Sequence, residues 1–174
     1  MSRETGAAIQ LTQCWTLVQS SCIRSGMEIR IEQAAALNAE LDPLVAEADA
    51  DGHLFMRRLC DEWVSGSNRF DGPGEKLMTA RVGDRLAGVG GLNRDPYAQA
   101  PGIGRLRHLY VARDARCRGV GALLVRAILA GADAHFTLIR LRTDSVEAAA
   151  FYARLGFQGT NDANATHVMR IDIS

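Results

Sequence analysis

The sequence predicts a single domain of the α/β class, and three observations lead to this prediction. The chain has 174 residues, which suits one domain with a sizeable core. Residues 106–111 are rich in β-forming side chains and lead through a short loop into an amphipathic helix that begins near Val120. A further strand at 136–142 makes the order strand, helix, strand, which implies a right-handed crossover and a parallel pair. Two earlier strands, 77–82 and 86–92, flank a tight hairpin and are expected to be antiparallel.

The first expected strand, residues 27–31, alternates apolar and polar side chains and opens the domain, which we place at 27–174. Residues 1–26 are an extension of uncertain structure. They could be disordered, could pack as an extra helix, or could precede a true start at Met27. Polar side chains interrupt any signal-peptide core in this segment, so secretion is not expected.

Two helices are expected next, at 33–50 and 52–64. The first places several leucines on one face and restarts at Asp42-Pro43, where proline suits the first helical turn. The second should bury Leu54 or Phe55, together with Leu59 and Trp63. A loop rich in glycine and serine, 65–74, follows it.

The glycines of the strand at 86–92 are Gly88, Gly90 and Gly91, and they alternate with apolar residues. A dinucleotide-binding motif would require a helix after them, whereas a loop at 93–104 follows. We therefore interpret these glycines as bulge or close-packing positions.

The end of the chain is predicted to contain one short helix and a final hairpin. Asp144 or Ser145 can cap the helix, and Gly156 is suited to its C-terminal end. The hairpin joins strands at 157–160 and 167–173.

The loop between the central strand and its helix has the composition of an anion site. It reads Arg116-Cys117-Arg118-Gly119-Val120-Gly121. Glycines let the backbone approach a ligand closely, and the first amides of a helix have no internal partner. Two arginines add positive charge at the positive end of the helix dipole. The loop therefore predicts a phosphate site, although the glycines alone could simply tighten the turn.

Two motifs resemble those of the GNAT superfamily of acyl-CoA-dependent N-acyltransferases. The pattern L-x-V, a short gap and R-x-x-G-x-G is similar to the acyl-CoA pyrophosphate loop of that superfamily, and here it consists of Leu109, Val111, Arg116, Gly119 and Gly121. The second signature, SVEAAAFYARLGF at 145–157, follows at the expected distance.

The resemblance implies the GNAT fold, a mixed, mostly antiparallel central sheet with a splayed parallel strand pair, flanked by helices. It also implies acetyl transfer from acetyl-CoA to a primary amine, with no metal. The pantetheine arm would enter the gap between the splayed strands, as an added strand would. The residues implied to bind acetyl-CoA are Leu109, Tyr110, Val111, Arg116, Cys117, Arg118, Gly119, Val120, Gly121, Ala122 and Ser145.

Catalytic roles follow from the same resemblance. Tyr152 matches the tyrosine that many members use as the acid that protonates the leaving thiolate. It could instead be an ordinary half-buried aromatic side chain. A backbone N–H near Tyr110 or Val111 would stabilise the oxyanion. Ser145 stands where the family often has asparagine, which weakens one cofactor contact.

The general base is not determined. Some members carry a glutamate six residues before the valine that matches Val111, and here that position is Arg105, which cannot accept a proton. Asp95, Tyr97 and His108 are candidates, and so is ordered water.

The acceptor site is expected near the two early helices, where Trp63, Asn68, Arg69 and Phe70 could line a pocket or serve only as core and turn residues. Four arginines suggest an acceptor that bears a carboxylate or phosphate, unless solvent alone surrounds them: Arg69, Arg94, Arg105 and Arg107.

Charge and cysteine content exclude several classes of partner. The formal net charge is zero, so neither a broad nucleic-acid surface nor an anionic-membrane surface is indicated. The four cysteines, Cys14, Cys22, Cys60 and Cys117, are scattered without a metal-binding spacing, and this favours reduced thiols and a cytoplasmic location. Catalytic use of Cys117 is not expected.

An alternative from another functional class is a non-catalytic acyl-CoA-binding module, which would keep the phosphate loop without needing Tyr152. A nucleotide-binding domain is disfavoured because G-x-x-x-x-G-K-[ST] is absent. The acceptor and the acyl chain length stay open, and so does the oligomeric state, with a homodimer as one option.

Overall fold

The computed structural model describes residues 22–24 and 27–171. Most of the predicted extension, residues 1–21 and 25–26, lies outside the described residues, as do residues 172–173 at the end of the last predicted strand. Strand β1 (Cys22–Arg24) pairs antiparallel with β2 (Met27–Gln33). The domain boundary at residue 27 stays a prediction.

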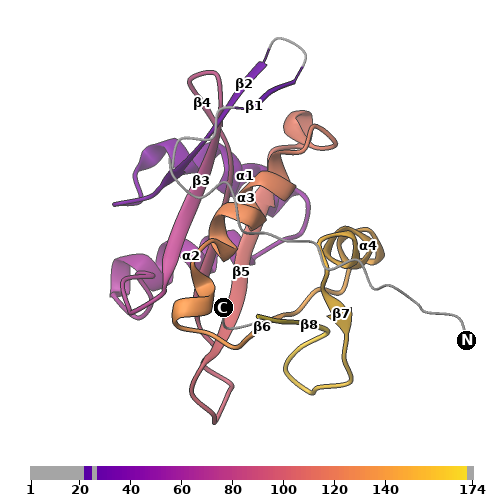
Figure 1. The fold of residues 1–174 in the computed structure, drawn as a ribbon. Helices are drawn as coiled ribbons and strands as arrows, with labels where there is room; N and C mark the ends of the chain where they lie inside the picture. The colour runs from indigo at the N-terminus through magenta and orange to yellow at the C-terminus, as the bar shows by residue number, and fades with distance from the viewer. Residues whose placement is uncertain (1–21, 25–26, 172–174) are drawn as a thin grey trace, which may run out of the picture.

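The core of the molecule is an eight-stranded sheet with the order β1-β2-β3-β4-β5-β6-β8-β7 (Figure 1). The remaining strands are β3 (Lys76–Val82), β4 (Arg85–Arg94), β5 (Ile103–Val111), β6 (Leu138–Leu141), β7 (Gln158–Gly159) and β8 (His167–Arg170). Neighbouring strands are antiparallel except for β5 and β6, which are parallel. The predicted mixed, mostly antiparallel sheet with one parallel pair is confirmed.

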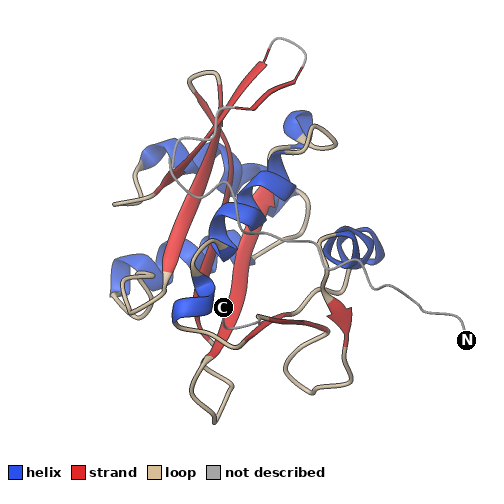
Figure 2. Ribbon diagram, viewed as in Figure 1, coloured by secondary structure: helices blue, strands red, loops and turns tan. Residues whose placement is uncertain are grey.

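Helices cover both faces of this sheet (Figure 2). They are α1 (Asp42–Ala50), α2 (Phe55–Ser65), α3 (Val120–Leu129) and α4 (Val146–Arg154), with short 3-10 turns at Ala39–Leu41, Arg113–Ala115 and Ala132–Ala134. Helix α3 lies on one face, and α1 and α2 lie on the other (Figure 1). In the part of the chain that the structure describes, no helix combines the length and apolar character needed to cross a membrane.

The helix predicted at 33–50 is wrong in its first half. Gln33 belongs to β2, where it pairs with Met78 of β3, and regular α-helix begins only at Asp42. The predicted restart at Asp42-Pro43 is where the helix starts, because proline needs no N–H partner in the first turn. Helix α2 likewise begins three residues later than predicted, and Leu54 is 67% exposed.

The glycines of β4 occupy close-packing positions, as predicted. A Cβ on Gly91 would lie 2.4 Å from the ring of Phe70, which packs on the α2 face. On the α3 face, Cβ atoms at Gly88 and Gly90 would meet Leu124 and Ile128 at 2.9 and 3.0 Å. The pairing of β4 with β5 shifts register between Val89 and Gly91. The absence of side chains at these three glycines therefore lets α3 approach β4 from one face and Phe70 from the other.

We predict that Gly91→Ala destabilises the fold by about 1–3 kcal/mol, because a Cβ must displace a buried aromatic ring. The free energy of unfolding, measured by urea titration, tests this. Gly159→Ala is the control, since a Cβ there meets nothing within 4 Å. Equal stability of the two variants would contradict the packing argument.

Candidate functional site

The parallel pairing of β5 and β6 is short, and it leaves one edge of β5 open. Backbone partners run from Ile103 with Leu138 to Arg105 with Arg140, and no further. From residue 106 to Val111, β5 pairs only with β4 among the described residues. The predicted splay of the two strands is thus present, and it exposes the β6-facing edge of residues 106–111.

Val111 directs its backbone groups to this open edge. The next residue, Ala112, donates its N–H to Ala87 at the β4 side, at 2.9 Å. Successive residues of a strand point their backbone groups to opposite sides, so the N–H and C=O of Val111 face away from β4. Arg116 Nε donates to that carbonyl at 2.9 Å. The N–H of Val111 is therefore in the direction expected of an oxyanion donor.

The loop after β5 and the start of α3 present a set of backbone amides. Cys117 and Gly119 both have positive φ, 59° and 86°. The first intrahelical bond runs from Leu123 N to Gly119 O at 3.0 Å, so the amides of residues 120–122 precede the first internal donor of the helix. A Cβ on Gly119 would meet nothing within 4 Å, which leaves room for a ligand beside its backbone.

Two carboxylates hold this loop in place, one on Glu47 of α1 and one on Asp51, the residue that follows this helix. Asp51 accepts hydrogen bonds from Arg113 and from Arg116, the latter at 3.1 Å, while Glu47 accepts from Arg113 N at 2.8 Å. The Tyr110 hydroxyl lies 2.9 Å from Glu47 and 3.0 Å from Asp51. Hydrogen bonds from the arginines hold the pKa of Asp51 well below its usual value. Arg116, predicted to contact phosphate, thus also ties the loop to α1, and its phosphate role stays a prediction.

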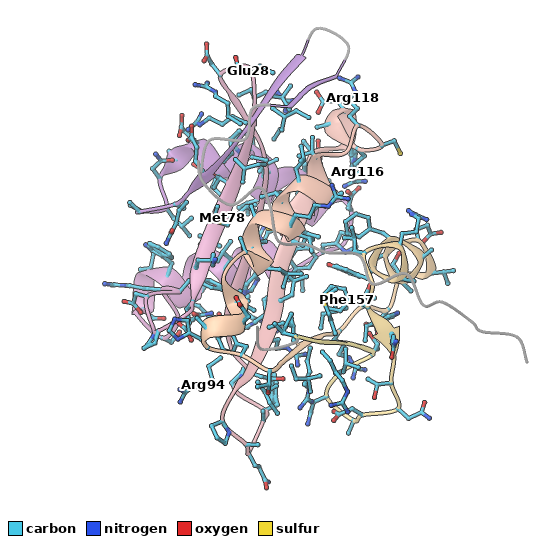
Figure 3. All side chains as sticks on the ribbon, in the orientation of Figure 1. Glu28, Met78, Arg94, Arg116, Arg118 and Phe157 are labelled. Carbon is cyan, nitrogen blue, oxygen red and sulfur yellow. The ribbon has the colours of Figure 1, made fainter. Side chains whose placement is uncertain are left out.

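Two other loop residues predicted to contact the cofactor, Cys117 and Arg118, lie at the surface, whereas Val120 is buried. Cys117 is a free, exposed thiol, and Arg118 is exposed as well. Figure 3 shows Arg116 and Arg118 at the same end of α3, beside its N-terminus. Both cations therefore lie at the positive end of the helix, as the phosphate site requires.

Helix α4 carries the other predicted residues and approaches the N-terminus of α3. A Cβ on Gly121 would lie 3.3 Å from the Phe151 ring. Next to it, Tyr152 is 8% exposed and packs against Phe157, with ring centroids 5.6 Å apart. Burial raises the pKa of Tyr152 well above its usual value. Ser145 caps α4, since its Oγ accepts from Ala148 N at 3.2 Å.

A cavity of about 360 Å³ lies on the α2 face of the sheet. It is lined by Glu62, Gly66, Ser67, Asn68, Arg69, Asp71, Glu75, Asn93, Pro96, Tyr97 and Arg107. Of the four predicted acceptor-site residues, Asn68 and Arg69 line it. Phe70 is instead buried against Gly91, and Trp63 packs on the core.

Glu62 and Asn93 line the cavity but were not predicted from the sequence, although both had a signal. Glu62 comes three residues after the buried Leu59, so helical spacing places a carboxylate at the inward face of α2. Asn93 follows Gly91 by two residues in β4, which puts it on the same face of the sheet.

The three candidates for the general base differ in their surroundings. The Asp95 side chain has no exposed area and lies 3.4 Å from Arg105 and 3.2 Å from Arg140. Tyr97 is 54% exposed at the cavity. Asp95 is therefore closed off from an acceptor, whereas Tyr97 is open to one.

His108, the third candidate, sits at an irregularity of β5 with φ of 55°. Its Nδ1 lies 2.8 Å from Phe55 O. Because a carbonyl only accepts, Nδ1 carries the proton and Nε2 bears a lone pair. Burial lowers the pKa of His108 to about 4, with the nearby Arg107 charge acting in the same direction. The imidazole is therefore neutral at physiological pH.

The arrangement was compared with known proteins. A family model described as an acetyltransferase (GNAT) domain matches residues 73–159, which is half of the chain. The chain belongs to the GNAT acetyltransferase family. The matched part of this GNAT protein contains β3 to β7, hence the splayed strands, the glycine-containing loop and both α3 and α4.

Solved structures agree with this assignment. A proposed acetyltransferase from Exiguobacterium sp. 255-15 is 25% identical, with a TM-score of 0.73 over 82% of this chain and 93% of that one. The GNAT family N-acetyltransferase YhbS of Escherichia coli, solved in complex with CoA, is 17% identical, with a TM-score of 0.62 over 86% and 84% of the two chains. The second likeness shows the fold alone. No curated protein matches the sequence of this GNAT protein.

We predict that neutral, buried His108 makes stability depend on pH. The folded-state pKa is below the usual 6.5, so the unfolded chain binds the proton more tightly. Stability is full above about pH 6.5 and falls as the pH drops toward 4. Between pH 7 and pH 5 wild type should lose about 2 kcal/mol more than His108→Asn. Asparagine tolerates the positive φ and can still donate to Phe55 O.

Urea titrations at the two pH values measure this difference in the free energy of unfolding. His135→Asn, which replaces an exposed histidine, is the control. If wild type and His108→Asn lose the same stability, the histidine is not buried in its neutral form.

Proposed function

We propose that this protein is an N-acetyltransferase that moves the acetyl group of acetyl-CoA to a primary amine of a small molecule, by direct attack in a ternary complex. One observation carries the proposal. The open edge of β5 continues directly into a loop with two arginines and into a helix whose amides at 120–122 precede its first internal donor. An extended thioester with a pyrophosphate at one end matches these two neighbouring features.

The proposed donor site uses backbone more than side chains. The pantetheine arm would pair with the edge of Leu109, Tyr110 and Val111, and the pyrophosphate would take the amides of residues 117–122. Arg116 and Arg118 would contribute charge, and Ser145 would lie near the pantetheine. The Tyr110 side chain is engaged by Glu47 and Asp51, and its backbone groups point to β4, opposite to those of Val111. Tyr110 would therefore hold this edge in position, while the backbone of its neighbours bonds the cofactor.

In the proposed reaction, the neutral amine nitrogen attacks the thioester carbon to give a tetrahedral oxyanion, which collapses as the carbon–sulfur bond breaks. The nitrogen gives up one proton to ordered water, one of the candidates for the base, and the leaving thiolate takes up one proton. Holding the two reactants together supplies much of the rate. The Val111 N–H is directed to the open edge and would stabilise the oxyanion. Tyr152 would protonate the leaving thiolate, and its raised pKa keeps the hydroxyl protonated at neutral pH, which is the state that a general acid needs.

The acceptor would occupy the cavity beside α2, whose volume suits a small molecule. Two of the arginines that suggested an anionic acceptor are paired inside the protein, Arg105 with Asp95 and Arg107 with Glu62. A carboxylate or phosphate on the acceptor would therefore be met by Arg69, whose Nε donates to Trp63 O. A cytoplasmic location, supported by the scattered cysteines, is part of this proposal.

We predict that acetyl-CoA at about 100 times its dissociation constant adds roughly 2.7 kcal/mol of stability to wild type. Gly119→Asp should fold but lose this effect, because a carboxylate replaces the open space next to the loop amides. Thermal unfolding with and without acetyl-CoA measures both. Gly131→Asp is the matched control, since Gly131 also has positive φ and open surroundings but lies at the other end of α3.

A folded wild type whose midpoint does not rise with any acyl-CoA would contradict the proposed donor site. A Gly119→Asp variant that responds like Gly131→Asp would move that site away from the α3 N-terminus.

We also predict that Tyr152→Phe lowers kcat by about a hundredfold or more, as the loss of a general acid does. The variant should keep the acetyl-CoA stabilisation, because only a hydroxyl is removed. Release of free CoA thiol in the presence of a panel of primary amines measures kcat. Unchanged turnover would exclude Tyr152 as the acid. Acetyl-CoA binding by wild type without turnover of any amine would favour a non-catalytic acyl-CoA-binding module.

A further inference from the structure

Four charged side chains meet at the point where the parallel pairing of β5 and β6 ends. Arg105 of β5 and Arg140 of β6 are the last partners in this pairing. Arg105 Nη1 donates to Asp95 Oδ2 at 3.4 Å, and Arg140 Nε lies 3.2 Å from the same oxygen. Arg140 Nη2 also donates to Asp162 Oδ1 at 2.7 Å. We call these four residues the Asp95 cluster.

The Asp95 cluster is largely buried, and its charges balance. Both guanidinium side chains are 8% exposed, and the Asp95 carboxylate has no exposed area. Two arginines face two carboxylates, so the cluster carries no net charge. A buried carboxylate without its partners is costly, so moving either arginine away from Asp95 is strongly unfavourable. The cluster therefore fixes the distance between β5 and β6 at this point.

The cluster also holds the turn at 161–164, which leads into β8, the other neighbour of β6. Arg105 Nη2 donates to Asn164 O at 2.9 Å. Asp162 Oδ1 accepts from Asn164 N at 2.7 Å in addition to its bond from Arg140. Strand β5 is thus tied both to β6 and to the turn before β8, and β6 cannot shift along β5 unless these bonds break.

The open edge of β5 begins directly after the cluster. Figure 1 shows β6 beside the lower end of β5, from where the two strands diverge. On the other side of Asp95, its Oδ1 accepts from Tyr97 N at 2.9 Å, and the Tyr97 ring centroid lies 5.0 Å from Arg105 Cζ. Tyr97 lines the α2 cavity. The same carboxylate therefore contacts the base of the open edge and one wall of the cavity.

We propose that Asp95, Arg105 and Arg140 are positioning residues for the donor, because they set the separation of β5 from β6 that the pantetheine arm requires. An extended arm can pair with the β5 edge only where the gap between the strands fits it. A gap that is already formed spares the cost of ordering it on binding. The three residues act through the strand backbone and touch neither substrate.

This inference rests on the proposed function and adds residues that lie outside both sequence motifs, at 109–121 and 145–157. It also gives Arg105 a role. This position, where some GNAT members carry a glutamate, here holds an arginine that joins the two strands through Asp95.

The test compares acetyl-CoA with adenosine 3′-phosphate 5′-diphosphate, which is CoA without its pantetheine arm. Isothermal titration calorimetry gives the ratio of the two dissociation constants. In the double variant Asp95→Asn/Arg105→Gln, which removes one charge of each sign, the advantage of acetyl-CoA over the fragment should fall by about tenfold or more, as one or two hydrogen bonds of the arm are lost. The fragment itself should bind as it does to wild type, because the loop at the α3 N-terminus is unchanged.

Arg105→Lys is the milder variant, and it carries the test where the double variant does not fold. Lysine keeps the charge, but its single nitrogen does not present the fork that bonds Asp95 and Asn164 together. The advantage of acetyl-CoA should again fall, by about threefold or more.

The double variant Arg30→Gln/Asp84→Asn is the matched control, since it removes one charge of each sign from an exposed pair between β2 and the β3–β4 turn. It should keep the wild-type ratio. A folded cluster variant with the wild-type ratio overturns the inference, and so does an equal weakening of both probes, which is the result of a purely structural role. A wild type that binds neither probe refutes the proposed donor site and this inference with it.

Discussion

The parallel pairing of β5 with β6 ends at Arg105 and Arg140, and the rest of the site depends on where it ends. Both arginines are only 7% exposed, and both lie against the fully buried carboxylate of Asp95. Removing one partner from such a group would leave an uncompensated buried charge, which is strongly destabilising. Asp95 therefore holds the two strands together at one point, and beyond it β5 is free to keep β4 alone as its neighbour.

The open edge of β5 and its α2 face contribute different groups to the proposed site. Its open edge and the loop that follows it offer backbone groups, whose positions are set by Glu47 of α1 and by Asp51, which follows that helix. Its α2 face offers side chains, Arg107 and His108, which meet Glu62. The irregularity at His108 makes this possible, because two neighbouring side chains can then face the same helix. The proposed donor and acceptor sites thus meet across a single strand.

Because β4 has no side chain at Gly91, α2 and the loop that follows it can pack close to this strand. Gly91 leaves space for the Phe70 ring, and that ring in turn packs edge-on against His108, with centroids 6.1 Å apart. The acceptor side of the site is therefore built on packing between elements distant in sequence. The donor side is local, since it lies within one strand, one loop and one helix.

This difference explains how much could be predicted. The crossover, the parallel pair, the glycine-containing loop and the Ser145 cap of α4 follow from short-range patterns, namely β-rich runs, helical spacing and capping residues. The splay of the pair was implied only by the resemblance to the GNAT superfamily. The helix predicted at 33–50 was wrong at its start because Gln33 finds a strand partner in Met78, and long-range pairing outweighs local helix preference. Two acceptor-site predictions, Trp63 and Phe70, named residues that pack elsewhere.

The sequence by itself determined the class of fold, the family motifs and the loop at which we propose the backbone anion site, because each is encoded within a few consecutive residues. Only the tertiary structure decided which arginines are neutralised, where Asp95 is buried, and that Glu62 and Asn93 line one cavity while His108 lies beside Glu62. Those residues come from α2, β4 and β5, and no local pattern specifies their distance. Their hydrogen bonds and charges are set by burial, which depends on the whole packed core.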